Sequence, residues 1–208
     1  MSSGEKKLNI GKDERISPRE RLLSVASELF YRHGIRAIGV EAIAEAAETN
    51  KMTLYRHFPS KDELVAEYLR RFAEEAKSSW DQLEADHPGD PLAQLRAWLE
   101  DMATHVASGD ERGCALANAA VELPDKDHPA RRVIEAFKNA QRERLIQLCA
   151  AAVLAEPEML AYELFLMLEG ARVTAQSMGP KGLGDRLVRM GEAMITAHTI
   201  VEPARPST

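Results

Sequence analysis

The sequence predicts an all-α fold, in which a three-helix N-terminal domain is joined by a long helix to a larger helical domain. Apolar residues recur at spacings of three and four in nine segments, as on the buried face of an amphipathic helix. Capping residues precede several of these segments, and glycine or proline separates them. No segment alternates apolar and polar residues as a strand does, and no internal repeat is present.

Three helices are expected before residue 61. The tetrapeptide SPRE, which starts at Ser17, is a capping box, and the helix that it opens runs to about residue 33. A second helix is expected at about 40–47, and Asn50 is a good N-cap for a third helix at 51–57. The last two helices are separated by a turn of about three residues, so they form a candidate helix-turn-helix.

A much longer helix is expected to link this region to the rest of the chain. Pro59 ends the third helix, and SKDE, which starts at Ser60, is a second capping box. An apolar stripe continues from there to about residue 85, so one continuous helix joins the two parts mechanically. The remaining helices are expected at about 92–106, 113–122, 129–153, 157–178 and 184–199.

Charge is distributed unevenly along the chain. The net charge of the whole sequence is −6. Residues 1–61 contain 11 Lys and Arg against 8 Asp and Glu, which gives +3, whereas residues 62–208 contain 16 against 25, which gives −9. A nucleic-acid-binding head on an acidic body has this kind of asymmetry.

Composition and cysteine use favour a folded cytoplasmic protein. The sequence is 45% hydrophobic and 29% charged, which is typical of a packed helical chain. Its polar first 17 residues do not resemble a signal peptide, and no segment approaches the roughly 18 apolar residues of a membrane span. Cys114 and Cys149 lack CxxC spacing, so we expect ordinary buried thiols rather than a disulfide or a metal site.

Residues 34–64 closely resemble the DNA-binding domain of TetR-family (tetracycline-repressor) transcriptional regulators. The resemblance rests mainly on TLYRHFPSKDEL at 53–64, which spans the recognition helix, the turn and the start of the fourth helix. Gly39, Glu48 and Met52 depart from the usual family pattern. Glu48 stands where a glycine commonly makes the turn, and it brings a negative charge close to the expected DNA face.

A recognition helix must bury one face and present the other to DNA. Leu54 and Phe58 are four residues apart and are expected in the core. Lys51 and Thr53 lie at the start of the helix, where side chains enter the major groove most deeply, so they are candidates for contacts to a base or a nearby phosphate.

The remaining candidates hold the DNA backbone. Tyr55 and His57 match family positions that usually contact phosphates, and Lys61 stands at a helix N-terminus that already favours an anion. The complete expected DNA-binding set is Asn50, Lys51, Met52, Thr53, Tyr55, His57 and Lys61.

The family resemblance also implies a division of the chain and a set of partners. It implies an N-terminal arm at 1–16, a helix-turn-helix domain at 17–61, a regulatory and dimerisation domain at 62–202, and a tail at 203–208. Double-stranded operator DNA, a second copy of the chain and a small-molecule effector are the expected partners, without a membrane. No cofactor, metal or catalytic group is expected.

Two further sets of residues follow from this expectation. Large or polar groups on apolar helical stretches are candidates for an effector pocket: Trp98, Met102, His105, Asn118, Phe137, Phe165 and Arg172. Apolar stripes on the last two helices are candidates for the dimer interface: Leu160, Leu164, Met167, Leu168, Ala171, Leu187, Met190, Met194, Ile195 and His198.

Other functions are compatible with parts of this pattern. A helix-turn-helix does not distinguish a repressor released by an effector from an activator or a ligand-independent regulator. A helical enzyme is disfavoured, because the sequence has no G-x-S-x-G, H-E-x-x-H or P-loop pattern. A helical adaptor that binds only proteins would leave Lys51, Tyr55 and Lys61 without a role.

Overall fold

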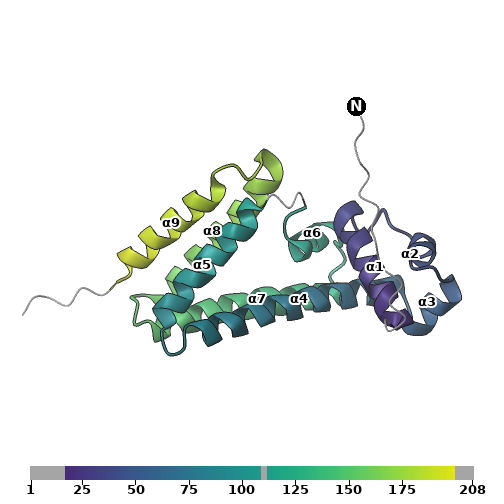
Figure 1. The fold of residues 1–208 in the computed structure, drawn as a ribbon, viewed down its shortest axis with the longest axis horizontal. Helices are drawn as coiled ribbons and strands as arrows, with labels where there is room; N and C mark the ends of the chain where they lie inside the picture. The colour runs from purple at the N-terminus through teal and green to yellow at the C-terminus, as the bar shows by residue number, and fades with distance from the viewer. Residues whose placement is uncertain (1–16, 109–111, 200–208) are drawn as a thin grey trace, which may run out of the picture.

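The computed structural model of this chain describes residues 17–108 and 112–199, and within these ranges it contains nine helices and no strand (Figure 1). The all-α class is therefore confirmed. The arm expected at 1–16 and the tail expected at 203–208 lie outside the described residues.

The three N-terminal helices form where the sequence predicts them. They are α1 (Pro18–His33), α2 (Val40–Ala46) and α3 (Lys51–His57). The Ser17 hydroxyl accepts a hydrogen bond from the Glu20 amide at 3.2 Å and so caps α1. In the same way the side chain of Asn50 caps α3, accepting from the Thr53 amide at 2.9 Å. These short-range bonds satisfy amides that the first turn of a helix leaves free.

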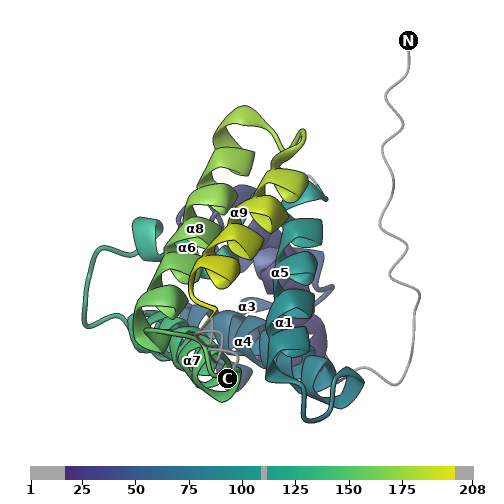
Figure 2. The ribbon, with the colours of Figure 1, turned by 90° about the vertical axis from the view of Figure 1, so that its left-hand side faces the viewer.

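The rest of the chain forms a body of long helices. The helix α4 (Lys61–Asp86) begins beside the N-terminal helices and runs alongside α7 into the body (Figure 1). Figure 2 views the opposite end, where α9 packs against both α5 and α8. The body helices are α5 (Pro91–Ala107), α6 (Ala115–Glu122), α7 (Pro129–Ala151), α8 (Pro157–Met178) and α9 (Leu183–Ala197).

The buried side chains form two separate clusters, and both include residues of α4. The first cluster joins α1, α2, α3 and the start of α4 to α6 and the start of α7. The second joins the far end of α4 to α5, α8, α9 and the end of α7. The helix α6 therefore packs with the head, the part formed by α1 to α3, although it lies more than 50 residues further along the chain.

A close helix crossing holds α9 on α5. Gly191 faces Leu99, and a Cβ atom at Gly191 would overlap the Leu99 side chain. A Cβ at Gly184 would lie 3.0 Å from the carbonyl oxygen of Ala103. Glycine at these two positions lets the helices approach closely, so one face of α9 is committed to its own chain.

Two features of the body concern general properties of the chain. None of the helices in the described ranges is long and apolar enough to cross a membrane. Cys114 and Cys149 are both buried free thiols, as the sequence predicts.

Candidate nucleic-acid interface and regulatory cavity

The recognition helix α3 is held by its buried face and by the turn before it. Leu54 is fully buried and Phe58 is 3% exposed, which places both in the core as expected. The Arg21 side chain in α1 donates to the carbonyl oxygen of Ala47 at 2.9 Å, which ties the turn to the head. Glu48 in that turn has a φ of +50°. This left-handed conformation explains why a glycine is common there in the family.

The other face of α3 is open to a ligand. Asn50, Lys51, Met52 and Tyr55 are exposed, and Met52 is the most open of them at 84%. Thr53 is half-buried. The structure thus brings the first residues of the predicted DNA-binding set onto one accessible surface.

Lys51 is not a free cation in this structure. Its Nζ lies 2.5 Å from Oε1 of Glu41 in α2, and it also lies over the Tyr55 ring at 5.8 Å from the ring centre. The hydrogen bond between the two side chains lowers the pKa of the Glu41 carboxyl and raises the pKa of Lys51. Sequence reasoning missed Glu41, because no local pattern indicates which side chain of α2 faces α3.

His57 and Lys61 are positioned differently from the exposed set. His57 is half-buried, and among the described residues its Nε2 is buried without a hydrogen-bond partner. The Nζ of Lys61 donates to the carbonyl oxygen of Ile35 at 2.6 Å and lies 5.9 Å from the centre of the Phe30 ring. Burial lowers the pKa of Lys61. A phosphate contact by Lys61 would therefore compete with a bond that fastens α4 to the turn after α1.

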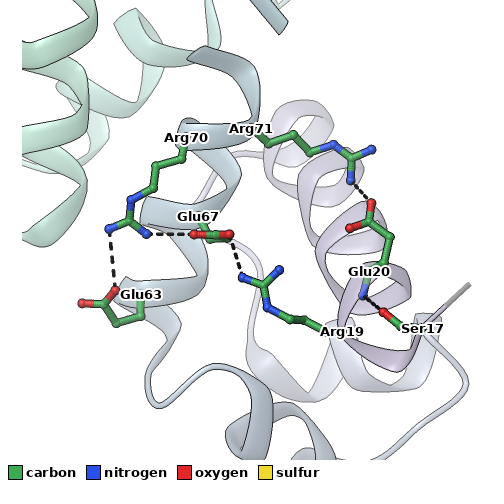
Figure 3. Close-up of polar contacts among 7 residues, drawn as sticks. All are labelled: Ser17, Arg19, Glu20, Glu63, Glu67, Arg70 and Arg71. Atoms are coloured by element: carbon green, nitrogen blue, oxygen red, sulfur yellow. Dashed lines mark hydrogen bonds and ion pairs between the residues drawn. The ribbon is translucent and has the colours of Figure 1, made fainter. Parts of the chain in front are cut away.

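Ion pairs fasten α1 to α4 (Figure 3). Arg19 in α1 reaches Glu67 in α4 at 2.6 Å, and Arg70 reaches the same carboxylate at 2.9 Å. Arg71 in α4 pairs in turn with Glu20 in α1. The Glu67 carboxylate accepts hydrogen bonds from Arg19 and Arg70, and these bonds lower the pKa of Glu67. The network makes the orientation of the head depend on α4.

A cavity of about 210 Å³ lies between α4, α5, α7 and α8. Five of the seven predicted pocket residues line it: Trp98, Met102, His105, Phe137 and Arg172. Asn118 lines a neighbouring cavity that also borders Arg172, and its side chain donates to the carbonyl oxygen of Arg112. Phe165 lines none of the described cavities and packs at the edge of the second core.

The cavity also contains residues that sequence reasoning did not select. Phe72, Glu75 and Trp80 come from α4, and Asp101 comes from α5. The apolar stripe of α4 already contains Phe72 and Trp80. Its spacing identifies a buried face but does not distinguish a cavity wall from a packed core.

Five residues of the predicted dimer interface belong to the core of the chain itself. Leu160, Leu164, Leu168, Leu187 and Ile195 are at most 4% exposed and form part of the second cluster. The prediction is wrong for these five, because a buried side chain has no surface left for a second subunit. Met167, Ala171, Met194 and His198 are half-buried, and Met190 is 49% exposed.

The accessible apolar side chains of α8 lie on its other face. Leu166 and Val173 are 64% and 60% exposed, and Gly170 between them is also exposed. Met159 and Tyr162 extend this stripe toward the start of the helix, and Met178 is exposed near its end. The amphipathic pattern misled the prediction, because α8 carries apolar residues both toward its core and toward solvent.

Comparisons with known proteins agree with this geometry. Residues 22–68 match the family model described as bacterial regulatory proteins, tetR family. A TetR transcriptional regulator of Streptomyces avermitilis, sav143, is 31% identical, with 88% of this chain and 98% of that chain covered and a TM-score of 0.76. SCO4454, a TetR-family transcriptional regulator of Streptomyces coelicolor, is 26% identical, with 87% and 95% covered and a TM-score of 0.80.

A third relative matches through a shorter segment. The HTH-type transcriptional repressor KstR2 of Rhodococcus jostii is 39% identical over 86 residues, which cover 41% of this chain and 40% of that repressor. Together with the accessible recognition helix, these likenesses show that the chain belongs to the TetR family and is a DNA-binding transcriptional regulator.

Proposed function

We propose that the chain is a homodimeric repressor that a small molecule releases from operator DNA. One observation carries this proposal: α4 takes part in both the head and the cavity. Leu64 and Leu69 of α4 are fully buried in the head core, whereas Trp80 of the same helix lines the cavity. A ligand that displaces the far end of α4 therefore tilts the helix that holds the recognition helix.

The helix α6 supplies a second mechanical link to the head. The Glu122 carboxylate at its end accepts a hydrogen bond from the Arg36 amide at 3.0 Å. Near its start, the Tyr31 hydroxyl of α1 donates to the Gly113 carbonyl oxygen at 3.0 Å. Gly113 also borders a cavity that shares Phe72 and His105 with the cavity at the Trp80 end of α4. A ligand between α4 and α5 therefore lies close to α4 and to the start of α6, the two elements that link the body to the head.

The proposed DNA contacts divide into two groups. The surface that enters the major groove consists of the exposed Asn50, Lys51, Met52 and Tyr55 and the half-buried Thr53, and an apolar Met52 side chain suits the methyl group of thymine. We keep His57 and Lys61 as supports of the DNA backbone contact, which act by positioning α3 and α4. The contact of Lys61 with Ile35 favours this indirect role.

A second copy of the chain is the proposed occupant of the exposed face of α8. Leu166 and Val173 are seven residues apart and so lie on one face of α8, and Met178 near its end and Met190 on α9 are further exposed apolar side chains. A two-fold dimer that joins these faces presents two recognition helices to a near-palindromic operator. The DNA-binding domain is then 17–61 and the regulatory and dimerisation domain 62–202, and we assign the chain no catalytic activity, metal or cofactor.

Footprinting tests the proposed DNA binding. The purified chain is titrated against the DNA upstream of its own gene and against shuffled DNA of the same length. We expect protection of a near-palindrome with half-sites about 34–36 Å apart or somewhat more. Protection of one asymmetric half-site, or equal affinity for both DNAs, would overturn the proposal.

A compound screen against the bound operator tests the effector step. For a compound that releases DNA, reciprocity requires that operator DNA weaken the binding of that compound by the same factor. Glu122→Gln weakens the link between α6 and Arg36. It should therefore reduce the factor by which the compound and the operator weaken each other's binding, while the chain still binds both. Glu135→Gln on the exposed face of α7 is the matched control. An unchanged factor in Glu122→Gln would exclude α6 as a route.

A further inference from the structure

The cavity between α4, α5, α7 and α8 is unusually aromatic for this chain. The sequence contains five Phe and two Trp, and four of these seven residues line the cavity: Phe72, Trp80, Trp98 and Phe137. The two indoles are stacked, with ring centres 5.9 Å apart and planes inclined by 11°. Phe72 and Phe137 meet edge to face at 6.1 Å. Such a wall offers π faces to a flat ligand.

A buried donor in this wall has no partner in the described part of the chain. Trp98 is 2% exposed, and its Nε1 is buried without a hydrogen-bond acceptor. A buried donor that lacks an acceptor is unfavourable, because it has lost its hydrogen bond to water and gained none in the protein. Because Trp98 lines the cavity, a ligand acceptor that reaches Nε1 would satisfy this donor.

The charged groups of the cavity leave an excess of negative charge. Asp101 has one ion-pair contact among the described residues, to Nδ1 of His105 at 3.4 Å. Glu75 lies 3.4 Å from Arg71, a guanidinium that already pairs with Glu20. Glu75 therefore shares one guanidinium with Glu20, and the ion-pair partner of Asp101 is a histidine, which is a cation only when it is protonated.

The arginine that lines the cavity, Arg172, offsets only part of this excess. Arg172 pairs with Glu169 at 3.0 Å, and Lys138 pairs with the same carboxylate at 2.6 Å. Its second amino group faces the sulfur of Met102 at 3.6 Å. Because Glu169 is shared by two cations, its single negative charge does not neutralise Arg172. The lining therefore holds two carboxylates, Glu75 on α4 and Asp101 on α5, against one guanidinium on α8, which leaves one net negative charge.

From these contacts we infer that the cavity binds a small flat aromatic cation with one hydrogen-bond acceptor. This inference rests on the proposed release of DNA by a ligand of the same cavity. Cations are attracted to the faces of Trp, Phe and Tyr rings, and the carboxylates of Glu75 and Asp101 add to the attraction. At about 210 Å³ the cavity is smaller than the roughly 300–1,000 Å³ of most drug-sized sites, so it suits one or two fused rings.

Three probes that differ in charge test the ligand class. They are 6-methoxy-1-methylquinolinium, 6-methoxyquinoline and 6-methoxyquinoline-4-carboxylate, which at pH 8 are a cation, a neutral molecule and an anion on the same bicyclic ring. Calorimetric titration of the full chain should give about tenfold tighter binding of the cation than of the neutral probe. No binding of the cation at millimolar concentration, or equal or tighter binding of either other probe, overturns the inference.

Variants locate the binding site. Asp101→Asn should weaken the cation about fivefold and the neutral probe less than twofold, because only the cation gains from the carboxylate. Asp81→Asn on α4 makes the same change outside the cavity and should leave both affinities unaltered. Thermal melting verifies that each variant folds, and Glu75→Gln supplies an independent second substitution. If Asp101→Asn and Glu75→Gln each weaken the binding of the cation and of the neutral probe equally, the charge of these carboxylates plays no role in binding and the inference is overturned.

Measuring operator affinity in the presence of the same probes distinguishes failure of this inference from failure of the proposed function. If the cation binds in the cavity but leaves operator affinity unchanged, the inferred ligand class is supported and the proposed release of DNA by an effector is wrong. If a neutral or anionic compound binds more tightly and releases DNA, the proposed release by an effector is supported and the inferred ligand class is wrong. Asp101→Asn at the same probe concentration controls for direct binding of the cation to DNA, because that artefact does not depend on Asp101.

Discussion

Lys51 at the start of the recognition helix forms an ion pair with Glu41 in the preceding helix, with Nζ and Oε1 2.5 Å apart. DNA binding must either break this pair or use it to aim the ammonium group. A lysine that is paired with a carboxylate attracts the phosphates of unrelated DNA less strongly than an unpaired lysine does. Glu41 is therefore placed to limit the binding of DNA that does not depend on its sequence.

Glu41→Gln should free Lys51 and strengthen binding to unrelated DNA more than binding to the operator. The salt dependence on unrelated DNA should become steeper by about one unit, for one added phosphate contact. Fluorescence anisotropy at several salt concentrations measures both. Glu45→Gln removes a neighbouring exposed charge of α2 that makes no ion pair with Lys51. Identical behaviour of the two variants would show that the pair has no effect.

Lys51→Ala should weaken operator binding by roughly 1–3 kcal/mol and binding to unrelated DNA by much less, if Lys51 contacts a base edge. Competition between operator and shuffled DNA gives the ratio directly. Arg56→Ala, an exposed position on the same helix, is the control for lost positive charge. Equal losses of Lys51→Ala on the two DNAs would assign Lys51 to phosphate instead.

Lys61→Met should lower the thermal stability of the head, by about 1 kcal/mol, because the carbonyl of Ile35 loses its donor. Operator and unrelated DNA should both bind more weakly, with an unchanged salt slope. Lys77→Met, on an exposed part of the same helix, should have neither effect. A slope that falls by about one unit in Lys61→Met would demonstrate a direct phosphate contact.

Leu166→Glu should dissociate the dimer, because it places a charge in the middle of the exposed apolar face of α8. Light scattering should give about 46 kDa for the unmodified chain and about 23 kDa for the variant at micromolar concentration. Val121→Glu adds the same charge at an exposed position of α6 and should remain dimeric. Identical masses for the two variants would place the interface elsewhere.

Cys149 should make the chain less stable at alkaline pH. Burial raises the pKa of the Cys149 thiol from about 9 to about 11. Its contribution to the free energy of unfolding is therefore complete below pH 9, where both states hold the proton, and is lost as pH rises toward 11. The loss should amount to about 2–3 kcal/mol.

Denaturant unfolding between pH 8 and 11 measures this loss. Cys149→Ala should flatten the pH dependence, although its cavity lowers stability at every pH. Cys114→Ala removes the other buried thiol and is the control for the loss of a sulfur atom from the core. A parent curve that coincides in shape with that of Cys149→Ala would contradict the expected role of Cys149.

The sequence by itself determined the helices and the helix-turn-helix. Ser17, Asn50 and Ser60 cap their helices through bonds to amides three residues away, and such contacts depend only on the local chain. The apolar spacing of Leu54 and Phe58 likewise required one buried face on α3. The family resemblance of residues 53–64 then indicated what the opposite face binds.

Only the tertiary structure decided which distant side chains meet. Leu164 and Leu166 of α8 are both apolar, yet one lies in the core and the other in solvent, because the packing of α7 and α9 selects the inward face. The stacking of Trp80 on Trp98 and the bond from Lys61 to Ile35 join residues 18 and 26 positions apart. Helical periodicity specifies a face, but the neighbour of that face depends on the packing of the whole chain.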